Sequence, residues 1–308
     1  MPGRVRWLRA SSAPSAFSAG AAAISGVGRR GRRLGPWVVV GLLGCSSNGA
    51  SGTDLGIADL ASAGPKDLTA PNPDALTTAY DNQFIGFWGI KAKVASIQTL
   101  PVFGDKGSTN TVLSVGQFRR DAMNKLVVDQ QECRITVQSE VSFIKTDVPD
   151  KIAETTPLLT GAVQVYGQAG LLGFNRAEVA TGIGCKLTDP FKDPLPTDKT
   201  DPKIFDQDAD TKLGVTVMPQ APIQGEVYVA QRRKYSYLNG LQQSATRLTG
   251  SIVDRSEQYI LDASDPQLKS QVVTRPVDAM SVFEMVKLPS QYPCTQLRAE
   301  ADTLFTLK

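Results

Sequence analysis

Short runs in which apolar and polar residues alternate fill most of the chain after residue 84. In the clearest run, residues 134–143, Ile135 and Val137 share one parity, while Arg134 and Gln138 take the other. Successive side chains of a strand point to opposite faces, so this spacing predicts a strand with one buried and one solvated face. No other feature of the sequence restricts the fold as strongly.

The same pattern predicts further short strands along the chain. The predicted strands span residues 94–100, 111–115, 125–129, 134–144, 161–166, 225–230, 248–253 and 259–261. The turn-forming segments between them include 104–107, 170–173, Asn239-Gly240 and Asp265-Pro266. Strands do not alternate with long helices, as a parallel sheet would require. Only residues 294–305 carry apolar residues at helical spacing, which predicts one short helix.

We therefore predict a mainly β fold in which residues 79–308 form a single antiparallel barrel or sandwich domain with a short C-terminal helix. A signal peptide and a disordered tether are expected to precede this domain.

The segment before Cys45 has the pattern of an export signal. A group of four arginines within residues 29–33 precedes an apolar stretch over residues 34–43, which is far shorter than the ~20 residues of a membrane-spanning helix. The stretch ends in Leu-Leu-Gly-Cys45, which resembles a bacterial lipobox, whose cysteine is lipidated. We expect residues 1–44 to be a signal region, with 27–44 as the true signal peptide, and Cys45 to carry the lipid. The alternative is a short buried segment with an incidental cysteine.

Residues 45–78 are rich in Gly, Ala, Ser, Asp and Pro. Such a segment cannot bury enough apolar surface to offset the entropy of ordering, so we predict a lipidated flexible tether, with a weak helix as the alternative. Together with the lipobox, it resembles exported lipoproteins of myxobacteria and related delta-type bacteria. A block over residues 206–217 and 225–229 is similar to the same group. The resemblance implies a lipid anchor in the cell envelope, at the outer membrane, but no activity.

Charge and histidine content exclude several functions. Removing the seven arginines before Cys45 from the 33 basic residues leaves 26, against 30 acidic residues. The mature chain therefore lacks the basic surface that would favour a nucleic-acid partner. The chain has no histidine, which excludes a Ser-His-Asp triad and His-ligated zinc. We expect no catalytic residues and, on balance, no enzyme; a carboxylate-based envelope hydrolase is the third functional hypothesis.

Gly86 and Trp88 lie at the start of the predicted domain. Gly86-x-Trp88 resembles the G-x-W that begins the first strand of lipocalins, in which the tryptophan plugs one end of an up-and-down barrel. This local resemblance implies an interior that binds a small apolar molecule, with Trp88 at the ligand site. An ordinary core tryptophan is the alternative. The first functional hypothesis is therefore a lipid-anchored, non-enzymatic binding module for a small apolar or amphipathic ligand.

Asp206, Asp208 and Asp210 alternate within an acidic stretch. Oxygen ligands at this spacing suit calcium, and the run resembles the front of an EF-hand loop. Two departures weaken this resemblance: Thr211 replaces the turn glycine and Val217 replaces the bidentate glutamate. A solvated acidic loop is the alternative. The second functional hypothesis is a structural or adhesion domain at the cell surface that calcium stiffens.

Three cysteines, Cys133, Cys185 and Cys294, remain after Cys45 is assigned to the lipid. An exported chain favours a disulfide, and three thiols leave one unpaired. We predict a bond between Cys133 and Cys294, which ties a central strand to the start of the terminal segment. Other pairings stay open, because connectivity does not follow from sequence.

A basic and aromatic cluster spans residues 232–237, with Arg232, Arg233 and Lys234 followed by Tyr235 and Tyr237. We expect it to be a solvated edge strand, whose charges discourage pairing with other chains. Contact with anionic lipid or lipopolysaccharide is the alternative.

Overall fold

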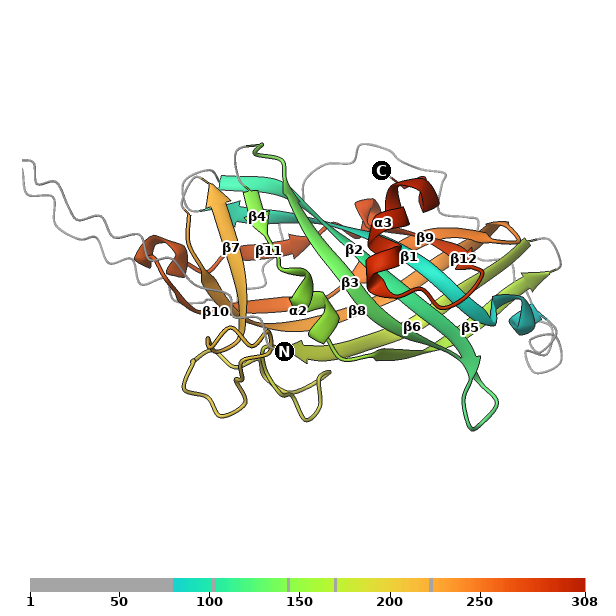
Figure 1. Cartoon of the computed structure of the whole chain (residues 1–308), viewed down its shortest axis with the longest axis horizontal. Helices are drawn as coiled ribbons and strands as arrows, with labels where there is room; N and C mark the ends of the chain where they lie inside the picture. Colours follow the sequence, from blue (N-terminus) through green and yellow to red (C-terminus); the bar gives the residue numbers. More distant parts are fainter. Residues whose placement is uncertain (1–79, 101–103, 143–144, 169–170, 222–223, 308) are drawn as a thin grey trace, which may run out of the picture. The chain divides into compact units, whose positions relative to one another are not determined.

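The alternating residues form the strands of one antiparallel sheet (Figure 1). The computed structural model describes residues 80–307, except 101–103, 143–144, 169–170 and 222–223, so the signal region, Cys45 and the tether lie outside the described residues. The strands are β1 (Gly86–Leu100), β2 (Gly104–Arg120), β3 (Leu126–Ser139), β4 (Lys145–Asp147), β5 (Leu159–Gln168), β6 (Leu171–Ile183), β7 (Val215–Ala221), β8 (Val227–Ser244), β9 (Arg247–Asp254), β10 (Glu257–Ala263), β11 (Val273–Pro276) and β12 (Val282–Leu288). The helices are α2 (Asp150–Thr155) and α3 (Cys294–Leu304), with 3₁₀ turns η1 (Pro266–Lys269) and η2 (Asp278–Met280).

Strand pairing in this sheet returns to its starting point. The antiparallel pairs run from β1 through β2, β3, β5, β6, β8, β9 and β12, and β12 pairs again with β1. A closed cycle in which neighbours in the chain are mostly neighbours in the sheet is the arrangement of an up-and-down barrel rather than a sandwich. The predicted mainly β, antiparallel fold is confirmed.

Four short strands prolong the barrel at one end. β4 pairs with β3, β7 and β10 pair with β8, and β11 pairs with β1. β7 continues the line of β6, because Ile183 lies opposite Gln231 and Val215 lies opposite Val229. Residues 184–214 are therefore an excursion from one long strand, and we call them the excursion. In the part of the chain that the structure describes, no backbone pairing joins β10 to β11, but the Gln271 side chain just before β11 bonds to the backbone N–H and carbonyl of Ile260 in β10.

Two glycines close the base of the excursion. Gly184 and Gly214 have φ angles of 68° and 98°, which side chains rarely adopt. A Cβ on Gly184 would lie 2.8 Å from the backbone of Gly214, and one on Gly214 would lie 2.6 Å from the Val229 carbonyl oxygen. The chain can leave and rejoin the barrel wall here because neither position carries a side chain.

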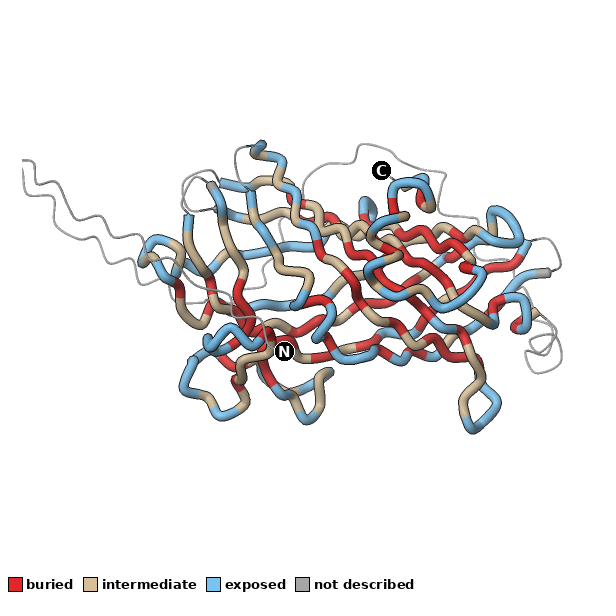
Figure 2. The backbone as a smooth tube through the Cα atoms, viewed as in Figure 1, coloured by how far each residue is buried: buried red, intermediate tan, exposed pale blue. Residues whose placement is uncertain are grey.

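Aromatic side chains fill the interior at the opposite end. Trp88, Phe118, Phe174 and Phe283 are each 2% exposed or less. Neighbouring rings in this series have centroids 5.6 to 6.0 Å apart, the spacing of favourable edge-to-face contacts. The Trp88 indole N–H donates to the Phe84 carbonyl at 2.7 Å, which holds the helical residues 80–84 against this end. Figure 2 shows the buried residues along the barrel wall and the exposed ones in the loops.

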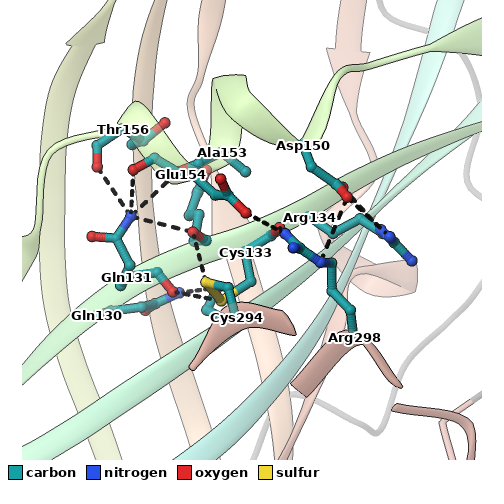
Figure 3. Close-up of a disulfide and its surroundings, with 12 residues drawn as sticks. Gln130, Gln131, Cys133, Arg134, Asp150, Ala153, Glu154, Thr156, Cys294 and Arg298 are labelled. Carbon is teal, nitrogen blue, oxygen red and sulfur yellow. Dashed lines mark hydrogen bonds and ion pairs between the residues drawn. A yellow bond between two sulfur atoms is a disulfide. The ribbon is translucent and has the colours of Figure 1, made fainter. Parts of the chain in front are cut away.

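The C-terminal helix packs outside the barrel, against β2 and β3. Its side chains belong to a second apolar cluster formed by Leu113, Val115, Cys133, Val286, Leu297, Ala301 and Phe305. The helix predicted for residues 294–305 is confirmed, with Leu297 and Ala301 buried. Cys133 and Cys294, the pair favoured from the sequence, form a disulfide with Cα atoms 5.0 Å apart (Figure 3).

Polar side chains tie α2 to this region, as Figure 3 shows. Asp150 accepts a hydrogen bond from Arg134 Nε at 2.9 Å and pairs with Arg298 at 3.5 Å. The hydrogen bond from Arg134, with the nearby positive charges, holds the pKa of Asp150 below its usual range. Gln131 Nε2 donates to carbonyl groups at the end of α2, including that of Thr156 at 3.3 Å. These contacts connect β3, α2 and α3.

β-bulges explain why some strand boundaries predicted from the sequence are wrong. The predicted strands 125–129 and 134–144 belong to one strand, β3, which ends at Ser139. The register of β3 against β2 shifts between Leu113 and Ser114. The alternation of inward and outward residues therefore changes within β3, and the sequence pattern predicted two strands where there is one. β6 was missed because two register shifts, on either side of Arg176, break its alternation.

The predictions for β8 also need correction. Asn239-Gly240 is not a turn but lies within β8 at a register shift, where Asn239 has a φ of 52°. Gly240 is needed there because a Cβ would lie 2.4 Å from the Phe174 ring. The solvated-edge interpretation of residues 232–237 is wrong, because β8 pairs along both edges. Arg232 is covered by the excursion, where it donates to the Asp193 carbonyl.

Candidate functional site

A cavity lies inside the barrel on the inward faces of five strands. Its lining residues are Ala92, Val94, Val112, Glu132, Arg233, Tyr235, Ile252 and Asp254. The cavity volume is about 20 Å³, enough for one water molecule. Apolar side chains from β1, β2 and β9 form most of the wall, and charged side chains come from β3, β8 and β9. The cavity is therefore small and amphipathic.

An ion pair forms the charged wall of the cavity. Arg233 Nη2 lies 3.1 Å from Glu132 Oε2, and the two residues are 7% and 1% exposed. Arg233 Nε has no hydrogen-bond partner among the described residues. Two charges removed from water are held only where they compensate each other, so each of these side chains depends on the other. Asp254 completes this wall, and its carboxylate accepts the Ser256 hydroxyl at 2.6 Å.

A second buried arginine packs against Tyr235 of the cavity wall. The Arg176 guanidinium carbon lies 4.5 Å and 4.1 Å from the ring centroids of Tyr235 and Tyr237. Arg176 Nη1 donates to Gln130 Oε1 at 2.6 Å, and within the described chain no carboxylate lies at ion-pair distance. Burial raises the pKa of both tyrosines, so their phenols are neutral. Cation–π contacts and hydrogen bonds thus take the place of an ion pair.

Among the described residues, several buried polar side-chain atoms in the barrel lack a hydrogen-bond partner. They are Ser96 Oγ, Asn110 Oδ1, Arg176 Nε and Arg233 Nε. Ser96 follows Val94 by two residues on β1 and Asn110 precedes Val112 by two on β2, so both share the inward face with the cavity wall. A buried polar atom without a partner costs about 1–3 kcal/mol. These atoms are therefore free to bond to a ligand or water.

Trp88 is not part of this cavity. Its ring packs among Phe84 and Phe118 at the closed end, with Lys287 Nζ 5.7 Å from the ring. Sequence reasoning missed Glu132 as a site residue and placed Arg233 on an exposed edge. One signal was available: Arg233 shares its parity with the apolar residues Val227 and Val229, which face the core.

The structure brings Asp206, Asp208 and Asp210 together within the excursion. One oxygen from each carboxylate lies within 4.8 Å of the others. The Asp206 carboxylate accepts the backbone N–H groups of Asp210 and Thr211 at 3.2 and 2.9 Å. Asp208 Oδ2 accepts the Thr216 N–H at 2.9 Å, and Asp210 accepts the Thr216 hydroxyl. The cluster is thus joined to the second residue of β7.

Burial distinguishes the three carboxylates. Asp208 is 6% exposed, and its Oδ1 is buried without a hydrogen-bond partner. Burial raises the pKa of Asp208, and the neighbouring charges of Asp210 and Asp206 add to this effect. For Asp206, burial acts in the same direction, but the backbone N–H groups outweigh it and the pKa is lowered. The pKa values of Asp208 and Asp206 are therefore shifted in opposite directions.

Among the helices of residues 80–307, none has the length and apolar character to cross a membrane. Comparisons with protein-family models, with curated proteins and with solved structures found no match to this chain.

Proposed function

We propose that the chain is a lipid-anchored protein of the cell envelope whose β domain binds a small amphipathic ligand inside the barrel. One observation carries this proposal: apolar walls meet the buried Arg233–Glu132 ion pair at one cavity, and Arg233 Nε has no hydrogen-bond partner among the described residues. Small-molecule sites typically combine a mostly apolar lining with a few placed polar groups.

The partner that Arg233 lacks at the cavity defines the chemistry of the ligand. Arg233 Nε is a buried donor without a partner among the described residues. A hydroxyl oxygen of the ligand can accept this hydrogen bond. Because the cavity of about 20 Å³ has room for one water-sized group, a short-chain alcohol must displace the apolar walls as its hydroxyl enters.

The arrangement also supports a lipocalin-like classification. The barrel is an eight-stranded cycle, Trp88 of the G-x-W fills one end, and a helix packs on the outer wall. Binding is favoured over catalysis because both carboxylates at the cavity are engaged, Glu132 by Arg233 and Asp254 by Ser256.

Substitution of Ala92 by valine tests the ligand site. Ala92 is 4% exposed and lines the cavity, so the added methyl groups occupy the space of the ligand. We expect short-chain alcohols to shift the NMR signals of cavity residues in the unsubstituted chain and to bind roughly tenfold more weakly to Ala92→Val, a loss of about 1.4 kcal/mol. Native mass spectrometry of the exported chain would detect a ligand retained from the host.

The matched control is Ala177→Val, the same change at an exposed strand position of β6. It is expected to bind like the unsubstituted chain. The proposal fails if neither a retained organic mass nor an alcohol-dependent shift is found, or if both substitutions weaken binding equally.

Anchoring through Cys45 is a separate part of the proposal and rests on the lipobox resemblance. Cys45→Ala is expected to move the chain from the membrane fraction to the aqueous phase on detergent partitioning, since the acyl chains supply most of the membrane affinity. Cys185→Ala, which changes a buried free thiol of the β domain, is expected to leave the chain in the membrane fraction. A Cys45→Ala chain that stays with the membrane contradicts the anchor.

A further inference from the structure

We propose that Asp206, Asp208 and Asp210 bind a calcium ion that fastens the excursion to the barrel wall at the start of β7. This site is separate from the cavity, and it does not depend on the proposed ligand.

The observation that points to a cation is the environment of Asp208. In a solvated acidic loop the carboxylates would face water, yet Asp208 is 6% exposed. Only Oδ2 has a donor, the Thr216 N–H, while Oδ1 is buried with no partner in the described structure. A buried carboxylate oxygen without a donor is costly. A cation shared with Asp206 and Asp210, whose oxygens lie within 4.8 Å, removes that cost.

The backbone between these residues agrees with this assignment. Ala209 and Thr211 have φ angles of 57° and 75°, a region that costs a non-glycine residue about 1–2 kcal/mol. Thr211 stands where an EF-hand loop has glycine, and it adopts the left-handed conformation that glycine would supply. The substitution of threonine for glycine therefore does not prevent the turn. The Thr211 N–H donates to Asp206, which orients that carboxylate.

The ligand set indicates calcium at modest affinity. All the side-chain ligands are carboxylate oxygens, which suit calcium, whose coordination geometry is less strict than the octahedron of magnesium. Val217 supplies no bidentate carboxylate, so water and backbone oxygens complete the shell. We expect a Kd of about 10⁻⁴ to 10⁻³ M, the range of extracellular calcium modules.

The location gives the ion a structural role. Asp208 and Asp210 both accept hydrogen bonds from Thr216 of β7, and Asp206 forms a backbone bridge with Gly214. The cluster lies where the excursion rejoins the barrel wall. Calcium binding is therefore expected to stabilise the contact between the excursion and β7. Calcium at about 10 mM is expected to raise the Tm of the full chain by roughly 5 °C relative to EDTA.

Asp208→Asn provides the test, with calorimetric titration of CaCl₂ into the full chain and thermal unfolding as readouts. The amide retains an oxygen for the Thr216 N–H but lacks the charge, so the Kd is expected to rise roughly tenfold or more. Asp198→Asn is the control, because Asp198 lies on the same excursion and its carboxylate accepts from Thr200 rather than joining the cluster. It is expected to bind calcium normally.

Asp210→Asn serves as a second variant if Asp208→Asn fails to fold, and the same loss of affinity is expected. The proposal is overturned if the unsubstituted chain shows neither binding heat nor a Tm shift at about 10 mM calcium, well above the expected Kd. It is also overturned if Asp208→Asn and Asp210→Asn bind like the unsubstituted chain. An equal Tm shift with MgCl₂ would overturn the assignment to calcium.

Discussion

Replacing Cys133 and Cys294 together by serine is expected to lower the free energy of unfolding by about 4 kcal/mol, the largest effect of a change outside the barrel interior. The bond joins residues 161 positions apart, so its loss greatly enlarges the unfolded ensemble. The loop-entropy relation gives about 5 kcal/mol for a loop of this length, and native disulfides typically contribute about 2–5 kcal/mol. For a domain of this size the Tm is expected to fall by roughly 10 °C.

Local order is expected to fall with the global stability. Cys133 is fully buried in the apolar cluster beneath α3, so the disulfide holds the first residue of the helix against β3. Amide exchange should therefore accelerate in α3 before it does in the barrel strands. Urea denaturation of the oxidised chain and of the double variant measures the stability change.

Dithiothreitol supplies the control for this prediction. It should destabilise the unsubstituted chain by a similar amount and leave the Cys133→Ser/Cys294→Ser chain unchanged, because Cys185 forms no disulfide. Equal stability of the oxidised and reduced chains would show that the apolar contacts of Leu297 and Ala301 hold α3 without the covalent bond.

Glu132→Ala is the second large perturbation, with an expected loss of about 3–5 kcal/mol in the free energy of unfolding. The substitution leaves the Arg233 guanidinium, 7% exposed, inside the barrel without its carboxylate partner. The penalty arises from an uncompensated buried charge rather than from the lost hydrogen bond alone. Chemical denaturation monitored by tryptophan fluorescence measures it, since Trp88 lies in the same core.

Two further variants separate charge from packing. Glu132→Leu with Arg233→Met removes both charges and is expected to recover most of the lost stability, because apolar replacements of buried ion pairs are often neutral or stabilising. Glu178→Ala removes one partner of the more exposed pair with Lys234, 3.4 Å apart, and is expected to cost less than about 1 kcal/mol. A similarly small effect for Glu132→Ala would mean that Asp254 or water compensates Arg233.

Local features of the sequence predicted the fold class, the terminal helix and one candidate group, the three aspartates. Alternation is a property of neighbouring residues, so the β class and the single terminal helix at Leu297 and Ala301 followed from it. The clustering of Asp206, Asp208 and Asp210 is equally local, because all three lie on one turn. In each case the interacting residues are close in the chain, and little depends on the rest of the fold.

The cavity could not be located in the same way. Alternation indicates which residues share a face, but not which face becomes the interior. Arg233 sits among basic and aromatic residues that suit an exposed edge, and only the pairing of β8 along both edges encloses it. Its partner Glu132 is 101 residues away and lies beside a bulge that reverses the parity of β3. The position of Trp88, packed at the closed end away from the cavity, likewise depended on how the barrel closed.

By itself, the sequence determined that the described chain would be an antiparallel β domain with a helix at its C-terminal end, because period-two and helical spacing act over a few residues. The tertiary structure decided that the sheet closes between β12 and β1, that residues 184–214 interrupt one long strand, and that a buried ion pair forms a wall of the cavity. These features arise from contacts between residues far apart in the chain. Register shifts and burial set those contacts, and neither is encoded in the spacing of a single segment.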